Sequence, residues 1–103
     1  MLDRVRDAAE EFDILHFHID QFHFPLFKSM AGRTVTTLHG RQDLPDIKPL
    51  YLGFPEMPLI SISDAQRKPV AKANFLATVH HGIPLDLYAP NFDPRGGYLA
   101  FLG

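Results

Sequence analysis

The alternation of apolar and polar positions divides this chain of 103 residues into short extended runs separated by helical patterns. Four apolar runs end in polar residues, and we expect them to be strands at 13–18, 34–39, 58–63 and 75–80. Their nearly continuous apolar character is typical of strands that are buried on both faces of a parallel sheet. Strands of this kind alternate with helices along a chain.

The segments between the runs have the spacing and the capping residues of helices. Residues 2–11 place apolar side chains on one face, and a second helix is expected near 21–31 with Asp20 as its cap. Asp46 is the expected cap of a third helix that continues through Leu52, and Ser63 and Asp64 begin a short helical turn. The prediction is an α/β fold, a partial Rossmann-like three-layer domain with a mainly parallel sheet.

In an open parallel sheet, ligands bind outside the carboxyl ends of the strands. Residues that follow different strands therefore meet at one edge, although they are far apart in sequence. We expect His18, His39, Ser63 and His81 to share this edge.

Composition narrows the classes of function. The 10 basic and 12 acidic residues give a net charge of −2, and no cluster of Lys or Arg predicts a nucleic-acid partner. The absence of cysteine excludes disulfides and thiolate metal sites and fits a cytoplasmic protein. No apolar stretch reaches the roughly 20 residues of a membrane span, and the charged start is not a signal peptide.

The last quarter of the chain differs from the rest because prolines and glycines are frequent there. We predict a partial domain over residues 1–88, an interdomain linker over 89–97 and the first strand of a further domain over 98–103. A sheet that starts after a helix and lacks partners at its edges indicates a piece of something larger. Uncovered edges also predict self-association, so a homo-oligomer is expected.

The histidines suggest two kinds of site. His16 and His18 form an H-x-H pair that, together with His39, could hold a metal ion as in metallohydrolases. The favoured interpretation is that His16 is a hydrogen-bonded core residue and His18 lies at the edge, with no metal. At His39-Gly40, an imidazole and backbone amides can approach a ligand together, although a histidine that caps the loop fits equally well.

Other polar clusters favour structural roles. Ser61, Ser63 and Asp64 resemble a nucleophile cluster, but the same pattern is what a helix N-cap requires, and capping is favoured. No Gly-x-Ser-x-Gly elbow and no glycine-rich phosphate loop occurs in the sequence. The His80-His81-Gly82 segment is typical of a turn after a strand.

Five segments occur in an order that is typical of one enzyme family. The first three are a D-hydrophobic-hydrophobic-H-x-H strand, a T-x-H-G strand end and an Ile-Ser-Ile-Ser strand and turn. The last two are a Gly-Ile-Pro-Leu-Asp segment that enters a linker and a final apolar strand. These are residues 13–18, 36–40, 60–67, 81–90 and 98–103. The series resembles the amino-terminal half of group 1 (family 4) retaining glycosyltransferases of the GT-B fold. His81 departs from the asparagine that is usual in the family.

The resemblance implies transfer of a sugar from a nucleotide-sugar donor to an acceptor with retention of configuration, without metal or cofactor. It implies a catalytic role for His39 and substrate binding by five further residues: His18, Asp20, Gly40, Ser63 and Gly82. The family's glycine-rich acceptor loop and its Glu-x7-Glu donor motif are not in this sequence, so the isolated chain is expected to be inactive. Two alternatives are a non-catalytic module that binds a sugar or phosphate, and the histidine-based metallohydrolase.

Overall fold

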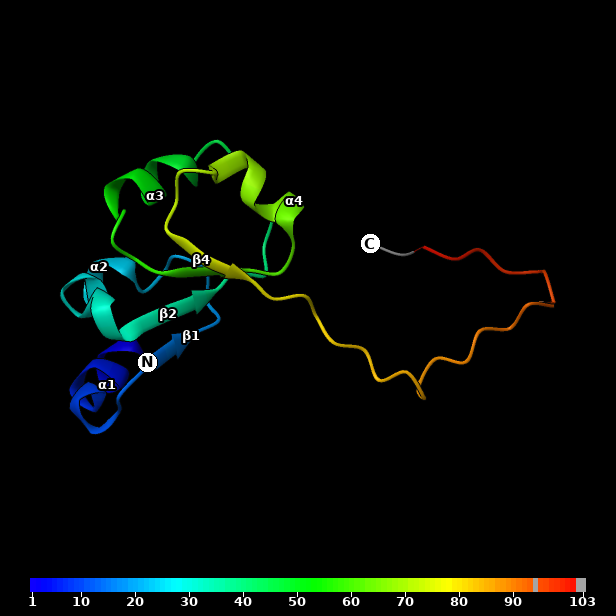
Figure 1. Ribbon diagram of the computed structural model, residues 1–103, viewed down its shortest axis with the longest axis horizontal. Helices are drawn as coiled ribbons and strands as arrows, with labels where there is room; N and C mark the ends of the chain where they lie inside the picture. The colour runs from blue at the N-terminus through cyan, green and yellow to red at the C-terminus, as the bar shows by residue number, and fades with distance from the viewer. Residues whose placement is uncertain (94, 102–103) are drawn as a thin grey trace.

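Four short strands pair side by side in the order in which they occur along the chain. The computed structural model describes residues 1–93 and 95–101, and its sheet has the order β1-β2-β3-β4 (Figure 1). Every pairing is parallel. The strands are β1 (Leu15–Phe17), β2 (Thr34–Thr37), β3 (Leu59–Ser61) and β4 (Phe75–Thr78). The predicted α/β fold with a parallel sheet is confirmed, and each strand ends one or two residues earlier than expected.

Short helical segments precede each strand. They are α1 (Leu2–Asp7) and the 3₁₀ segment η1 (Ala9–Glu11), α2 (Phe24–Phe27) and η2 (Lys28–Arg33), α3 (Lys48–Gly53), and α4 (Asp64–Arg67) and η3 (Lys68–Val70). The two longer predicted helices, over 2–11 and 21–31, are each divided into an α-helical and a 3₁₀ part. Met30 has non-helical backbone angles inside the second of these, which explains why a single α-helix does not continue there.

Two of the three predicted helix caps are wrong. The helices α2 and α3 begin at Phe24 and Lys48, so Asp20 and Asp46 lie too early in the chain to cap them. The third cap is confirmed, because the Ser63 hydroxyl accepts a hydrogen bond from the Gln66 amide at 3.2 Å. Pro49 lies in the first turn of α3, where the missing amide proton of proline costs no helical hydrogen bond.

One face of the sheet packs against the helical layer. Along β1, β2 and β3 alternate residues are buried while their neighbours are half-buried or exposed. Each strand lies beside the next strand of the chain, and crossovers between parallel strands are right-handed. Every connection therefore lies on the same side of the sheet. The core on that side consists mainly of large apolar residues: Ala9, Leu15, Phe17, Phe24, Phe27, Ala31, Leu38, Tyr51, Met57, Leu59 and Val70.

The opposite face of the sheet carries no helical layer within residues 1–93 and 95–101. Apolar side chains in or beside the two edge strands are exposed, with Ile14 at 59% and Leu76 at 64%. The predicted three-layer arrangement is therefore wrong for this chain, which forms two layers. The apolar strand residues that suggested burial on both faces are present, but the order of the connections leaves their second face bare.

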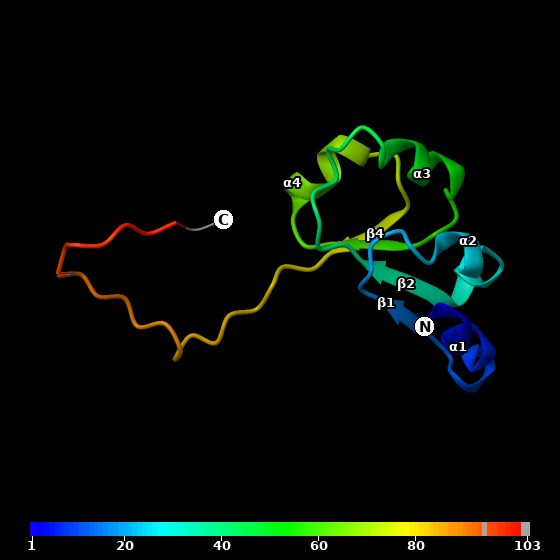
Figure 2. The same ribbon diagram turned by 180° about the vertical axis from the view of Figure 1, so that it is seen from behind.

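After β4 the chain runs away from the sheet as an extended tail (Figures 1 and 2). Residues 98–101 form no strand, and their apolar side chains are exposed. The strand predicted over 98–103 is therefore not formed at 98–101, because an isolated segment has no neighbour with which to pair; residues 102 and 103 lie outside the described residues. None of the described helices has the length and apolar character needed to cross a membrane.

Candidate functional site

Four histidines form a row of neighbouring rings at the carboxyl end of the sheet. His16 lies in β1, His18 follows β1, His39 follows β2 and His81 follows β4. The ring centroids are 4.3 Å apart for His16 and His18, 5.2 Å for His18 and His39, and 5.5 Å for His39 and His81. We call these four residues the histidine row.

Hydrogen bonds hold this histidine row across two neighbouring strands. His18 Nδ1 and His39 Nε2 are 2.9 Å apart, and His16 Nε2 is 2.8 Å from Thr37 Oγ1. One nitrogen of the His18–His39 pair donates and the other accepts, so at least one of the two rings is neutral. The rings of His16, His18 and His39 are therefore held in orientation by hydrogen bonds, and His81 joins the row by stacking on His39, although all four residues are exposed.

Asp20 lies at the same edge, and its backbone adopts a left-handed conformation with φ of 48°. Its Oδ1 accepts a hydrogen bond from the His39 main-chain N–H at 3.4 Å. A Cβ atom on Gly40 would come within 3.3 Å of Asp20 Oδ2, so glycine allows this close approach. The fold thus brings together His18, Asp20, His39 and Gly40, which were four of the six predicted site residues.

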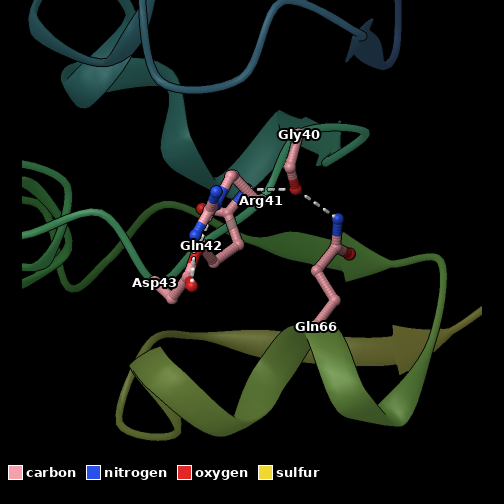
Figure 3. Close-up of polar contacts among 5 residues, drawn as sticks. All are labelled: Gly40, Arg41, Gln42, Asp43 and Gln66. Atoms are coloured by element: carbon pink, nitrogen blue, oxygen red, sulfur yellow. Dashed lines mark hydrogen bonds and ion pairs between the residues drawn. The ribbon is translucent and has the colours of Figure 1, made fainter. Parts of the chain in front are cut away.

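Two glutamine side chains hold the loop that follows His39 (Figure 3). Both donate to the Gly40 carbonyl, Gln42 at 3.0 Å and Gln66 at 2.8 Å. Gln66 also donates to the Leu38 carbonyl at 3.2 Å and accepts from the Ile62 amide at 2.9 Å. The loop after β2 is therefore tied to the loop after β3 and to α4 through one side chain.

Gln42 is itself held from the helical layer. The Tyr51 hydroxyl of α3 donates to Gln42 Oε1 at 2.5 Å, and both residues are buried. Burial raises the pKa of the Tyr51 hydroxyl, so this hydroxyl keeps its proton and remains the donor. The position of the Gly40 carbonyl is thus fixed from α3 as well as from α4.

A shallow groove of about 390 Å³, lined by both polar and apolar residues, lies between these loops. His39, Gly40, Ser63 and Gln66 line it, and an exposed ion pair between Arg41 and Asp43 lies at its side with N–O distances of 2.6 and 2.7 Å. The hydrogen bonds from Arg41 lower the pKa of Asp43 below its usual value. Ser63 therefore borders the same groove as His39 while it caps α4.

One sequence-based interpretation is wrong at this point. His16 is exposed and bonded to Thr37, so it is not a core residue; the fully buried histidine is His23. A Cβ atom at Gly82 would meet no other atom within 4 Å, and the substrate-binding role expected for Gly82 stays a prediction. Among the described residues no group of three or more histidine, cysteine, aspartate or glutamate side chains is placed so that it could hold a metal ion.

The sequence reasoning expected His81 at this edge, because His81 follows β4 as His39 follows β2. It missed three residues that hold the loop after His39: Gln42, Tyr51 and Gln66. Ser63-x-x-Gln66 has the spacing of a capping box, in which the glutamine normally reaches back to the amide of the cap residue. Here Gln66 reaches one residue further, to Ile62, and uses its amide group on another loop, which the spacing alone does not indicate.

Replacing Gln66 with alanine is expected to lower the free energy of unfolding by about 2 kcal/mol, because partly buried main-chain groups lose their partner. Urea unfolding measures this change, and the NMR signals of the His39 ring should shift at the same time. Gln21→Ala is the matched control, because the buried Gln21 Oε1 has no hydrogen-bond partner among the described residues. Equal losses in the two variants would contradict the role given to Gln66.

The geometry places polar residues at the carboxyl ends of the strands, which is where ligands bind in open parallel sheets. Comparison with protein families and with curated proteins finds no match to this chain.

Proposed function

We propose that this chain is the acceptor-side part of a retaining glycosyltransferase of the GT-B fold, with His39 at the reacting centre. The observation that supports this proposal best is the placement of His39. Its ring is bonded to His18, its main-chain amide is bonded to Asp20, and Gly40 beside it permits close approach. These are also the residues to which the sequence resemblance gives functional roles.

In this proposal His39 contacts the sugar that is being transferred. His39 Nε2 is bonded to His18, which fixes the direction in which the other ring nitrogen points. That nitrogen can donate or accept one hydrogen bond, which suits recognition of a sugar hydroxyl. His18 and Asp20 contribute to the acceptor side, and Ser63 and Gly82 to substrate binding nearby. The donor is a nucleotide sugar, and the reaction uses no metal or cofactor.

The activity belongs to the longer protein of which this chain would be a part. The donor-binding residues of the family lie beyond the motifs found here, and the family's reaction takes place between two domains. The isolated chain is therefore expected to release no nucleoside diphosphate from a nucleotide sugar. The proposed domain division, with residues 89–97 as a linker, is part of the same proposal.

The test is the transfer activity of the protein at its native length. With a panel of nucleotide sugars, His39→Ala is expected to lower kcat/KM by about a hundredfold, the usual loss when one positioned acid–base or hydrogen-bonding group is removed from a reacting centre. His80→Ala is the matched control, because His80 is exposed and adjacent to the histidine row without belonging to it. Normal activity of the His39 variant would overturn the assignment.

A second candidate is a module that binds a sugar or a phosphate without chemistry. The groove beside His39 favours it, because hydroxyl, amide and guanidinium groups meet there. Titration of the 103-residue chain with monosaccharides and with inorganic phosphate, followed by NMR, distinguishes the two functions. Saturable binding at His39 and Ser63 without any transfer activity at native length would favour the binding module.

A further inference from the structure

A second groove, of about 310 Å³, lies in the helical layer between α3 and η3, and it does not include the histidine row. Its floor is apolar and its rim is basic. It is lined by Lys48, Tyr51, Leu52, Lys68, Pro69, Val70, Ala71, Lys72 and Ala73. Its size is at the lower end of the range of pockets that take small ligands, which suits one or two side chains.

The charge around this groove is unusual for the chain. The chain has a net charge of −2, yet all three charged residues of the groove are lysines. Lys48, Lys68 and Lys72 form no ion pair within residues 1–93 and 95–101. An acidic residue near Lys48 is Asp43, whose pKa is lowered mainly by Arg41 and to a smaller extent by Lys48. Asp43 is already bonded to Arg41. The groove therefore favours an occupant with carboxylates and apolar side chains.

The tail of this chain has that chemistry. Between Ala73 and Asp93 the charged residues are two aspartates, Asp86 and Asp93. Large apolar side chains lie between and beside them, and all are exposed in the extended tail: Leu85, Leu87, Tyr88 and Phe92. In Figures 1 and 2 the tail projects away from the body, so these side chains are available to another molecule.

We infer that the groove between α3 and η3 binds residues 84–93 of a second copy of this chain. One or two of the tail's apolar side chains fill the groove, and Asp86 and Asp93 lie near its lysines. The concave shape favours a peptide over a lipid surface, because a membrane is bound by apolar side chains that protrude from the protein. This contact is independent of the function proposed for His39.

The position of the tail favours a second copy over the chain's own groove. The tail leaves from the carboxyl end of β4, whereas the groove is bordered by Val70 and Ala73, which come before the amino end of that strand. The ring of His81 stacks on His39, which leaves only Gly82 and Ile83 before Pro84. Proline also keeps the preceding residue extended, and the turn in which the Leu87 amide donates to the Pro84 carbonyl at 3.2 Å does not bring the tail back to the body (Figures 1 and 2). Reciprocal exchange of two tails would close a symmetric dimer.

The test is a charge exchange followed by sedimentation velocity over a wide range of protein concentrations. The unmodified chain is expected to form a dimer as its concentration rises. One variant reverses the groove (Lys68→Glu with Lys72→Glu) and another reverses the tail (Asp86→Lys with Asp93→Lys). Each variant alone is expected to dimerise at least about tenfold more weakly, because four favourable charge contacts become repulsive. A mixture of the two variants is expected to recover the dimer as a heterodimer.

Arg4→Glu with Arg6→Glu on α1 is the matched control, because it changes the net charge by the same amount as the groove variant. Circular dichroism confirms that each variant is folded. A chain that stays monomeric, a dimer that the groove and tail variants leave unchanged, or a mixture that fails to form the heterodimer would each overturn the inference. Loss of binding to anionic vesicles in the groove variant, without an effect on the dimer, would also overturn it.

Discussion

Lowering the pH from 6.5 to about 4 is expected to reduce the stability of this chain by about 3 kcal/mol through His23 alone. His23 is fully buried, its ring is stacked on Phe17 with centroids 3.8 Å apart, and its Nε2 lies 2.9 Å from Thr36 Oγ1. Burial lowers the pKa of this ring from 6.5 to about 4, and a main-chain contact with Asp20 opposes the shift only in part. The neutral ring is thus the folded form.

The sign follows from the protons that the two states bind. Between pH 6.5 and about 4 the unfolded chain holds a proton on His23 while the folded chain does not. Acid therefore favours unfolding in this range, and the contribution of His23 is fully present above pH 6.5. Asp43 and Glu56, whose pKa values are lowered, lose their contributions at a lower pH.

Urea unfolding at a series of pH values measures the effect in the unmodified chain and in His23→Phe. The variant has lower stability at neutral pH, because it loses the Thr36 hydrogen bond, but its stability should depend much less on pH between 6.5 and 4. His80→Ala, at an exposed position, should keep the pH dependence of the unmodified chain. An unchanged pH dependence in His23→Phe would show that the acid sensitivity arises elsewhere.

Replacing Phe24 with alanine is expected to cost about 3–5 kcal/mol, the largest stability effect that we predict for one substitution. Phe24 is fully buried where α2 meets α3, and its ring makes edge contacts with Tyr51 and Phe54 at centroid distances of 6.1 and 5.8 Å. Removal of the ring leaves a cavity, and the surrounding short helices would have to move inward to fill it. A small domain has a stability of only about 5–15 kcal/mol, so the loss is a large part of the total.

Phe22→Ala is the matched control, because Phe22 lies two residues earlier and is 75% exposed. It is expected to change the free energy of unfolding by less than about 0.5 kcal/mol. Thermal and urea unfolding of the two variants provide the comparison. Similar losses for Phe22 and Phe24 would mean that the aromatic cluster between α2 and α3 is not the core of this chain.

The position of the strands could be predicted from the sequence because it depends on local patterns. The β-branched run at Thr34–Thr37 and the apolar run at Leu59–Ser61 form strands as expected, and their parallel pairing places His39 and Ser63 at one edge. The Ser63 cap depends on a contact only three residues away, and it too was predictable.

Features that depend on contacts between distant segments could not be predicted in the same way. The Asp20 carboxylate accepts a hydrogen bond from the His39 amide, which lies 19 residues away in sequence, and Gln66 reaches Gly40 across 26 residues. The burial of His23 rather than His16 depends on which face of the sheet receives the helices. The apolar strands suggested two covered faces, whereas the topology covers one.

The agreement between strand order and chain order has a consequence for synthesis on the ribosome. Each strand lies beside the strand that was made just before it, so every pairing joins neighbouring segments and closes a short loop. The sheet can therefore grow by one strand and its crossover at a time as the chain emerges, without waiting for a distant segment. The last unit to form contains β4, whose pairing with β3 positions the backbone that leads to His81.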